Sequence, residues 1–163
     1  MNDLETKVAN ARRKWNLIQK SKTPVIYVGT ATCGVAAGAL DVLKSVKQTL
    51  KENGLKARVV QVGCIGPCYL EPLMDIAIPG RPRISYGPVD PASARKIIER
   101  YLIDGNPSSD LAIGHFGVNG DAPDGIPHFF DIPMLKPLVR VVLRNCGFIA
   151  PDDGGKDLFV HHS

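Results

Sequence analysis

Two cysteines on a loop that cannot be helical most constrain how this chain folds. Cys64 and Cys68 stand four residues apart in a segment that also contains two glycines and a proline. Glycine tolerates backbone conformations that other residues avoid, and proline interrupts a helix, so the segment is predicted to be a loop. Apolar, strand-like runs lead into it at 57–62 and out of it at 73–78. Both thiols are therefore predicted to lie at the end of a strand.

A third cysteine, Cys33, has a similar setting. The apolar run 24–28 leads into the glycine-containing loop 29–34, which carries Cys33, and a helical pattern follows. This loop lacks the Lys-Ser/Thr pair of a P-loop and the full GxGxxG spacing, so it is a weak signal for phosphate binding. Three of the four cysteines are thus predicted at strand ends, where loops can turn them toward one point.

The hydrophobic pattern gives the elements of the first half of the chain. An apolar stripe with helical spacing predicts a helix over 3–21, and packing of Trp15 into the core is its simplest interpretation. The run 24–28 is uninterrupted and rich in β-branched residues, which is typical of a strand buried on both faces. A helix over 35–50 and a strand over 57–62 would complete a parallel, right-handed βαβ unit.

The sequence pattern over residues 73–103 predicts a hairpin followed by a helix. Short apolar runs at 73–78 and 82–86 are separated by Pro-Gly-Arg, which favours two antiparallel strands. Asp90 and Pro91 indicate the start of a helix that runs to about Ile103. Together with the βαβ unit, this order predicts an α/β protein of the thioredoxin-like type, with a mixed sheet of about four strands.

The composition changes after Gly105. Residues 106–137 contain five prolines and several glycines and show no long period, so they are predicted to be an extended arm that binds partner subunits. The arm would leave four apolar side chains for a partner surface: Phe116, Phe129, Phe130 and Leu135. The predicted organisation is a helix at 1–22, a thioredoxin-like domain at 23–105 and the arm at 106–163.

Charge and hydropathy exclude several classes of protein. The net charge is +4, but the basic residues are spread out, and those of the first helix are interpreted as a solvated face, not a nucleic-acid site. No apolar run approaches the roughly 20 residues that span a membrane. The start of the chain lacks the apolar core of a signal peptide. We therefore expect a cytoplasmic protein, where clustered thiols favour metal or redox chemistry over disulfides.

The three loop cysteines indicate an iron–sulfur site. A [2Fe–2S] cluster takes four thiolates, of which Cys33, Cys64 and Cys68 supply three, so these are the predicted ligands of the cluster iron. One alternative is that the three cysteines are buried and free. The other is a zinc site, which is disfavoured because the sequence has neither a second cysteine pair nor a histidine near the first pair. The absence of a Cys-x-x-Cys motif disfavours a redox dithiol. Cys146 is interpreted as a small buried apolar residue.

Acidic residues flank the cysteine loop. Glu71 and Asp75 follow Cys68 closely in the sequence. A charged pair at this place would tune a reduction potential or form a salt bridge with Arg83. The alternative is that both carboxylates only solvate the rim of the loop. All four histidines are expected to be exposed, because they lie in the arm or the tail.

Three segments resemble a known family: Gly29–Ala39, Val62–Leu73 and Pro79–Tyr86. They are similar to the N-terminal thioredoxin-like ferredoxin domain of the NADH-binding flavoprotein subunit. That subunit occurs in bacterial relatives of complex I, NAD-linked hydrogenases, electron-bifurcating enzymes and formate dehydrogenases. The segment Val142–Gly147 also resembles the one that opens the flavin domain of the family. The resemblance covers residues 20 to 150 and implies electron transfer between a flavin and other iron–sulfur centres.

The chain departs from this family in two ways. The family carries a further cysteine near the end of the first strand, where this chain has Tyr27 and Val28. The predicted ligand set is therefore incomplete, and the substitutes considered are water or an oxygen of one of four residues: Thr30, Thr32, Tyr27 and Glu71. The glycine-rich NADH and FMN site of the family and its [4Fe–4S] motif would come later, so we expect no NAD or FMN site on this chain.

These observations predict an accessory electron-transfer component without a complete active site of its own. It would be a subunit or domain of a multi-subunit NAD(H)-linked oxidoreductase, with flavoprotein and iron–sulfur subunits as partners. The alternative is a cluster-free, degenerate thioredoxin-like adaptor that docks subunits of such a complex.

Overall fold

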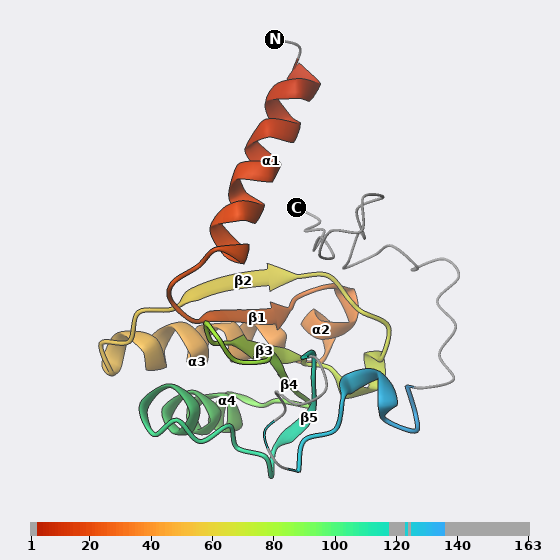
Figure 1. Cartoon of the computed structure of the whole chain (residues 1–163). Helices are drawn as coiled ribbons and strands as arrows, with labels where there is room; N and C mark the ends of the chain where they lie inside the picture. Colours follow the sequence, from red (N-terminus) through yellow and green to blue (C-terminus); the bar gives the residue numbers. More distant parts are fainter. Residues whose placement is uncertain (1–2, 118–122, 124, 136–163) are drawn as a thin grey trace.

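A mixed sheet of five strands forms the centre of the protein in a computed structural model that describes residues 3–117, 123 and 125–135 (Figure 1). The strands are β1 (Val25–Gly29), β2 (Arg58–Val62), β3 (Met74–Ala77), β4 (Ile84–Tyr86) and β5 (Ala112–His115). Their order across the sheet is β2-β1-β3-β4-β5. Only β1 and β2 are parallel, and each of the other neighbouring pairs is antiparallel.

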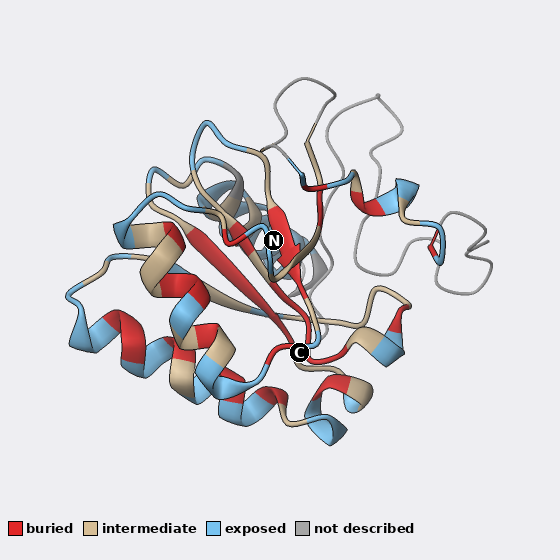
Figure 2. Cartoon of the chain, turned by 90° about the horizontal axis from the view of Figure 1, so that it is seen from below, coloured by how far each residue is buried: buried red, intermediate tan, exposed pale blue. Residues whose placement is uncertain are grey.

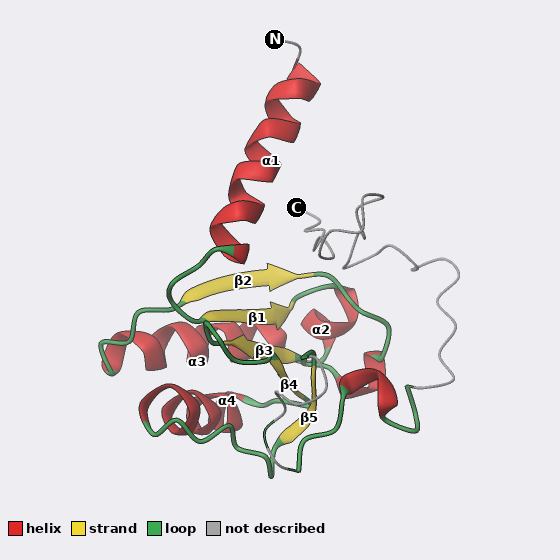
Figure 3. Ribbon diagram, in the orientation of Figure 1, coloured by secondary structure: helices red, strands yellow, loops and turns green. Residues whose placement is uncertain are grey.

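Helices cover one face of this sheet (Figures 1 and 3). The α-helices are α1 (Asp3–Gln19), α2 (Thr32–Ala36), α3 (Ala39–Glu52) and α4 (Pro91–Ile98). Shorter helical turns are the 3-10 turns η1 (Cys68–Leu70) and η3 (Phe129–Asp131) and the π-helical turn η2 (Glu99–Ile103) that prolongs α4. Helices α3 and α4 lie side by side beneath the strands, where Figure 2 shows their buried sides against the sheet.

The core lies between the sheet and these two helices. Alternate residues of a strand point to one face, so Ile26 and Val28 of β1 face the same way. Both are fully buried in a cluster with Val46 of α3 and Ile97 of α4. Every residue of β1 is buried, which confirms the prediction of a strand covered on both faces. The parallel βαβ unit, the β3–β4 hairpin and the thioredoxin-like order of elements are confirmed as well.

The segment after Gly105 differs from the predicted arm. Strand β5 adds to the sheet by pairing with β4, so the sheet has five strands and not about four. Three apolar side chains that follow it are buried in the protein itself: Ile126, Phe129 and Leu135. The expectation that Phe129 and Leu135 remain for a partner is therefore wrong, whereas Phe130 is 47% exposed. The three-part division of the chain stays a prediction, since residues 136–163, with Cys146, lie outside the described part.

The helix predicted over 35–50 is two helices. Helix α2 begins at Thr32, so Cys33 lies in the first turn of a helix and not on a free loop. Gly38 separates α2 from α3 with a φ of 101°, a left-handed conformation that favours glycine. The apolar spacing continues across this break, which is why the sequence pattern does not reveal it.

Helix α1 does not pack into the core. It extends away from the sheet in Figure 1, and its side chains Val8 and Leu17 are 41% and 52% exposed. Trp15 is only half-buried, so the interpretation that it packs into the core is wrong. An amphipathic pattern fixes the face of a helix but not what covers that face.

The start of α4 provides a test of local stability. The carboxylate of Asp90 accepts a hydrogen bond from the backbone N–H of Ser93 at 2.7 Å, and the Ser93 hydroxyl accepts one from the N–H of Asp90 at 3.0 Å. We expect Asp90→Ala to lower the free energy of unfolding in urea by about 1 kcal/mol, because it removes this cap. Asp104→Ala, at an exposed carboxylate after η2, is the matched control and should change it little.

The effect of the cap should depend on pH. Hydrogen bonds from the side chain and then the backbone of Ser93 hold the pKa of Asp90 below its ordinary value. A lowered pKa means that the stabilisation is complete above the pKa of the unfolded chain and is lost as the pH falls through the folded value. The difference between wild type and Asp90→Ala should therefore shrink in acid, and a difference that grows there would contradict this account.

Candidate metal centre

Cys33 is positioned by the junction of β1 and α2. The N–H of Gly29 donates to the carbonyl of Leu73 at 2.9 Å, and the N–H of Thr30 donates to the carbonyl of Val62 at 2.9 Å. These bonds fix the chain between its two neighbouring segments just before α2 begins. A Cβ atom at Gly34 would lie 2.2 Å from the carbonyl oxygen of Gly29, so only glycine fits beside Cys33.

Cys64 and Cys68 lie on a tight turn after β2. Gly66 has a φ of 119°, and its carbonyl accepts a hydrogen bond from the N–H of Cys68 at 2.8 Å. The N–H of Gly66 itself points at the Cys64 sulfur, with a nitrogen–sulfur distance of 3.3 Å. The turn brings the sulfur atoms of Cys64 and Cys68 to 3.4 Å from each other. The predicted loop conformation is thereby confirmed up to Cys68, where the 3-10 turn η1 begins.

The two junctions bring three thiols together. The Sγ atoms of Cys33, Cys64 and Cys68 all lie within 4.8 Å of one another, and no second group of three or more potential metal ligands occurs among the described residues. Two thiolates on one tetrahedral metal, with metal–sulfur bonds of about 2.3 Å, stand about 3.7 Å apart. The spacing of the sulfurs fits metal ligation. The predicted convergence is confirmed, and the role of these cysteines as ligands stays a prediction.

Burial makes the thiols of Cys33 and Cys64 weaker acids than an ordinary cysteine. It raises the pKa of Cys64 to about 12, against the opposing hydrogen bond from the N–H of Gly66. Burial also raises the pKa of Cys33. A metal must therefore displace protons from these groups, so its apparent affinity should increase with pH.

Glu71 lies directly beside Cys33. Its side chain is buried, with the residue only 6% exposed, and Oε1 lies 3.9 Å from the Cys33 sulfur. The backbone N–H of Leu73 donates to Oε2 at 2.8 Å. Burial raises the pKa of Glu71, while the hydrogen bond from Leu73 lowers it. The interpretation that Glu71 solvates the rim of the loop is wrong, because the carboxylate points inward.

Unlike Glu71, the carboxylate of Asp75 forms a salt bridge. Its Oδ2 lies 3.5 Å from Nε of Arg83, and both side chains are largely buried, which confirms the predicted salt bridge for this residue. The guanidinium of Arg83 also lies over the rings of Phe116 and Tyr27, at 4.2 and 5.4 Å from their centroids. Asp75, Arg83 and Tyr27 thus form a charged and aromatic cluster next to the cysteines. They line a small cavity of about 20 Å³ together with Glu71.

The positions where the resembling family has its further cysteine carry no thiol here. Val28 is fully buried in the core cluster, and Tyr27 lies under Arg83. His115 is 3% exposed on β5, with its ring 5.3 Å from that of His128, so the expectation of exposed histidines is wrong for His115. Burial lowers the pKa of His115, and neither histidine belongs to the group of three thiols.

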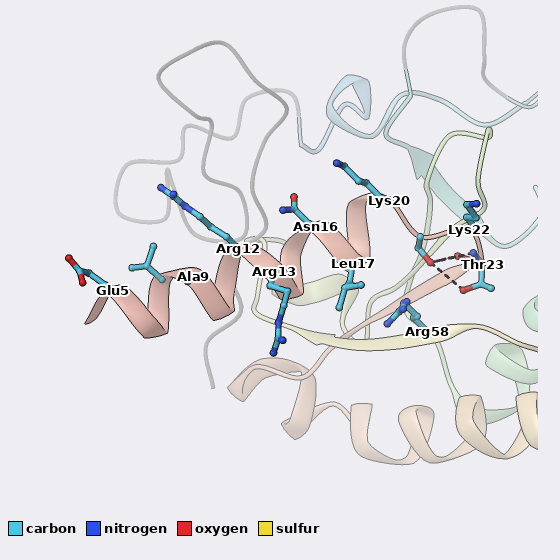
Figure 4. A pocket seen from close by; sticks show the side chains of 12 residues that line it. Glu5, Ala9, Arg12, Arg13, Asn16, Leu17, Lys20, Lys22, Thr23 and Arg58 are labelled. Carbon is cyan, nitrogen blue, oxygen red and sulfur yellow. Dashed lines mark hydrogen bonds between the residues drawn. The ribbon is translucent and has the colours of Figure 1, made fainter. Parts of the chain in front are cut away.

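A groove of about 1050 Å³ lies away from the thiols, between α1 and the start of β2 (Figure 4). Basic side chains of α1 and of the following linker surround it, together with Arg58 of β2. The linker is held by the Ser21 hydroxyl, which donates to the carbonyl of Thr23 at 2.8 Å. No cysteine lines the groove, so it is separate from the candidate metal centre.

Comparisons with known proteins place this geometry in context. No protein-family model matches the chain. The NADP-reducing hydrogenase subunit HndB of Solidesulfovibrio fructosivorans is 33% identical over 84 residues, which span 51% of this chain and 67% of that subunit. The chain belongs to the family of this hydrogenase subunit.

The fold has a parallel among solved structures. A thioredoxin-like [2Fe-2S] ferredoxin from Aquifex aeolicus superimposes with a TM-score of 0.51 and 18% sequence identity, covering 61% of this chain and 98% of the ferredoxin. This similarity confirms the predicted thioredoxin-like ferredoxin fold. In the part of the chain that the structure describes, no helix combines the length and apolar character of a membrane span.

Proposed function

We propose that this protein is an electron-transfer subunit that holds a [2Fe–2S] cluster with Cys33, Cys64 and Cys68. The observation that carries the proposal is the placing of three thiols from two separate junctions within 4.8 Å of one another. Soft thiolate ligands suit iron in such clusters. When bound, a [2Fe–2S] cluster supplies the transfer of single electrons at a potential that the surrounding protein sets.

The protein around the thiols supports this role. Cys33 and Cys64 are half-buried, whereas Cys68 is exposed and Tyr69 beside it is 55% exposed. One side of the centre therefore lies within the fold and the other opens on the surface, where the redox centre of a partner can approach. The turn at Gly66 and the absence of space at Gly34 hold the thiols in place, so little ordering is needed when the cluster binds.

The proposed partners are the other subunits of a multi-subunit oxidoreductase. The related HndB is a subunit of an NADP-reducing hydrogenase, and we extend that setting to this chain. The electron donor and acceptor would be flavin and iron–sulfur centres of those subunits. We place the protein in the cytoplasm, because the centre requires thiols that are kept reduced.

Anaerobic purification with iron and sulfide analysis tests the proposal. We expect the full chain, reconstituted with ferrous iron and sulfide, to be brown and to bind two irons and two sulfides per chain, as its cluster type requires. Colourless protein with bound zinc would instead establish the zinc alternative. Colourless protein without metal would establish the cluster-free adaptor.

A further inference from the structure

The three cysteines leave one ligand position of a [2Fe–2S] cluster unfilled, and one side chain of the described structure is placed to fill it. We propose that Glu71 supplies the fourth ligand, through its Oε1 atom. This inference rests on the proposed cluster. The resulting ligand set is three cysteines and one carboxylate in place of four cysteines.

Glu71 is a buried carboxyl group that forms no ion pair among the described residues. Glu71 is 6% exposed, and within the described residues no lysine, arginine or histidine forms a salt bridge with it. Arg83, the nearby cation of the same cavity, pairs with Asp75. A buried carboxylate is costly unless it is paired or coordinates a metal. A metal at the thiols would provide that compensation.

The position of Oε1 also favours ligation. The hydrogen bond from Leu73 holds Oε2 and leaves Oε1 facing the Cys33 sulfur at 3.9 Å. A thiolate and a carboxylate on one tetrahedral metal, with bonds of about 2.3 and 2.1 Å, stand about 3.6 Å apart. The remaining two sulfurs, of Cys64 and Cys68, are 3.4 Å apart. Oε1 of Glu71 thus lies about as far from the Cys33 sulfur as two ligands on one metal do, while the three sulfurs lie within 4.8 Å of one another.

Two glycines leave space for the Glu71 carboxylate beside Cys33. A Cβ atom at Gly29 would lie 2.7 Å from Oε2 of Glu71, and one at Gly34 would lie 3.1 Å from the same oxygen. Two glycines thus form the wall against which the carboxylate rests. Any other residue at either place would push the carboxylate from its position beside Cys33.

The other protein donors considered from the sequence are less suited. Tyr27 lies under the guanidinium of Arg83, which engages its ring. Thr32 is exposed and Thr30 is half-buried, and a hydroxyl offers no charge to replace that of the missing thiolate. Glu71 alone among these has a carboxyl group, which ionises far more easily than a phenol or an alcohol, so as an anion it preserves the total charge that four thiolates would give. Its oxygen is a harder donor than sulfur, so the cluster should be more labile than one with four cysteines.

The test compares Glu71→Gln with wild type in the full, reconstituted chain. Mössbauer and X-ray absorption spectra of wild type should show two inequivalent irons, one of them with an oxygen ligand. In Glu71→Gln this oxygen signal should be lost or altered, iron loss to a chelator should be about tenfold faster or more, and the reduction potential should move upward. The potential should rise because a neutral amide replaces a negative ligand.

Asp75→Asn is the matched control. It removes the charge of another largely buried carboxylate lining the same cavity, but one that pairs with Arg83, and it should leave the iron spectra unchanged. The melting temperature of iron-free Glu71→Gln should be no lower than that of iron-free wild type, since glutamine keeps an acceptor for the N–H of Leu73 and places no charge in the buried site. A purely structural role would lower that temperature.

The outcomes separate the two proposals. A wild-type cluster with only sulfur ligands, or an oxygen signal that Glu71→Gln leaves unchanged, would overturn the assignment of Glu71 and leave the electron-transfer proposal standing. Wild-type protein that binds no iron after reconstitution would overturn both. The wild-type spectra decide the presence of an oxygen ligand even if the variant does not fold.

Discussion

Replacing Cys64 or Cys68 by alanine is expected to abolish the visible absorption of the reconstituted protein. Each change removes one of only three thiolates, from a pair whose sulfurs lie 3.4 Å apart on a turn fixed by Gly66. Alanine offers no donor, whereas a serine oxygen at the same place is still a ligand for iron. The measurement is the iron and sulfide content together with the absorption spectrum after anaerobic reconstitution.

Two further variants complete this experiment. Cys33→Ala should also remove the absorption, because its sulfur belongs to the same group within 4.8 Å. Cys146→Ala is the matched control: it deletes the one cysteine that the prediction leaves out of the centre and should retain the full iron content. Retention of the spectrum in the Cys64 and Cys68 variants, or its loss in Cys146→Ala, would show that the ligands are other than proposed.

The sequence predicts most of the sheet because its strands carry strong local signals. The run that becomes β1 is continuously apolar, and the β3–β4 hairpin has Gly80 at its turn with a φ of 77°. Strand β5 has no such signal. It is four residues long, lies between irregular segments, and becomes a strand only because the edge of β4 offers it backbone partners. Pairing across the chain is tertiary information that a periodicity does not contain.

The same contrast applies to the candidate site. The cysteines are conspicuous in the sequence, because glycine and proline surround them at the ends of predicted strands. The role of Glu71 cannot be recognised in the sequence. It depends on the chain folding back after η1, which places the carboxylate against Gly29 and Gly34. An acidic residue beside a loop is ordinarily exposed. Only the fold shows that this one is buried next to a thiol.

The segment that follows β5 can be tested for its place in the fold. Phe129 is 2% exposed, and its ring stacks on that of Phe116 with centroids 4.5 Å apart. A Cβ atom at Gly114 would lie 2.8 Å from the Cα of Phe129, so β5 and this segment are in close contact. We expect Phe129→Ala to lower the free energy of unfolding by about 3 to 5 kcal/mol, because it leaves a cavity where an aromatic ring was buried.

Phe130→Ala is the matched control for this prediction, since the neighbouring ring is 47% exposed. It should cost less than about 1 kcal/mol, as surface substitutions ordinarily do. Urea unfolding of both variants and wild type, followed by circular dichroism, measures the difference. If the two substitutions had equally small effects, the segment would be an arm that contributes little to the fold, as the sequence pattern alone predicted. A large loss confined to Phe129→Ala would show instead that the ferredoxin-like domain continues through this segment and that its stability depends on it.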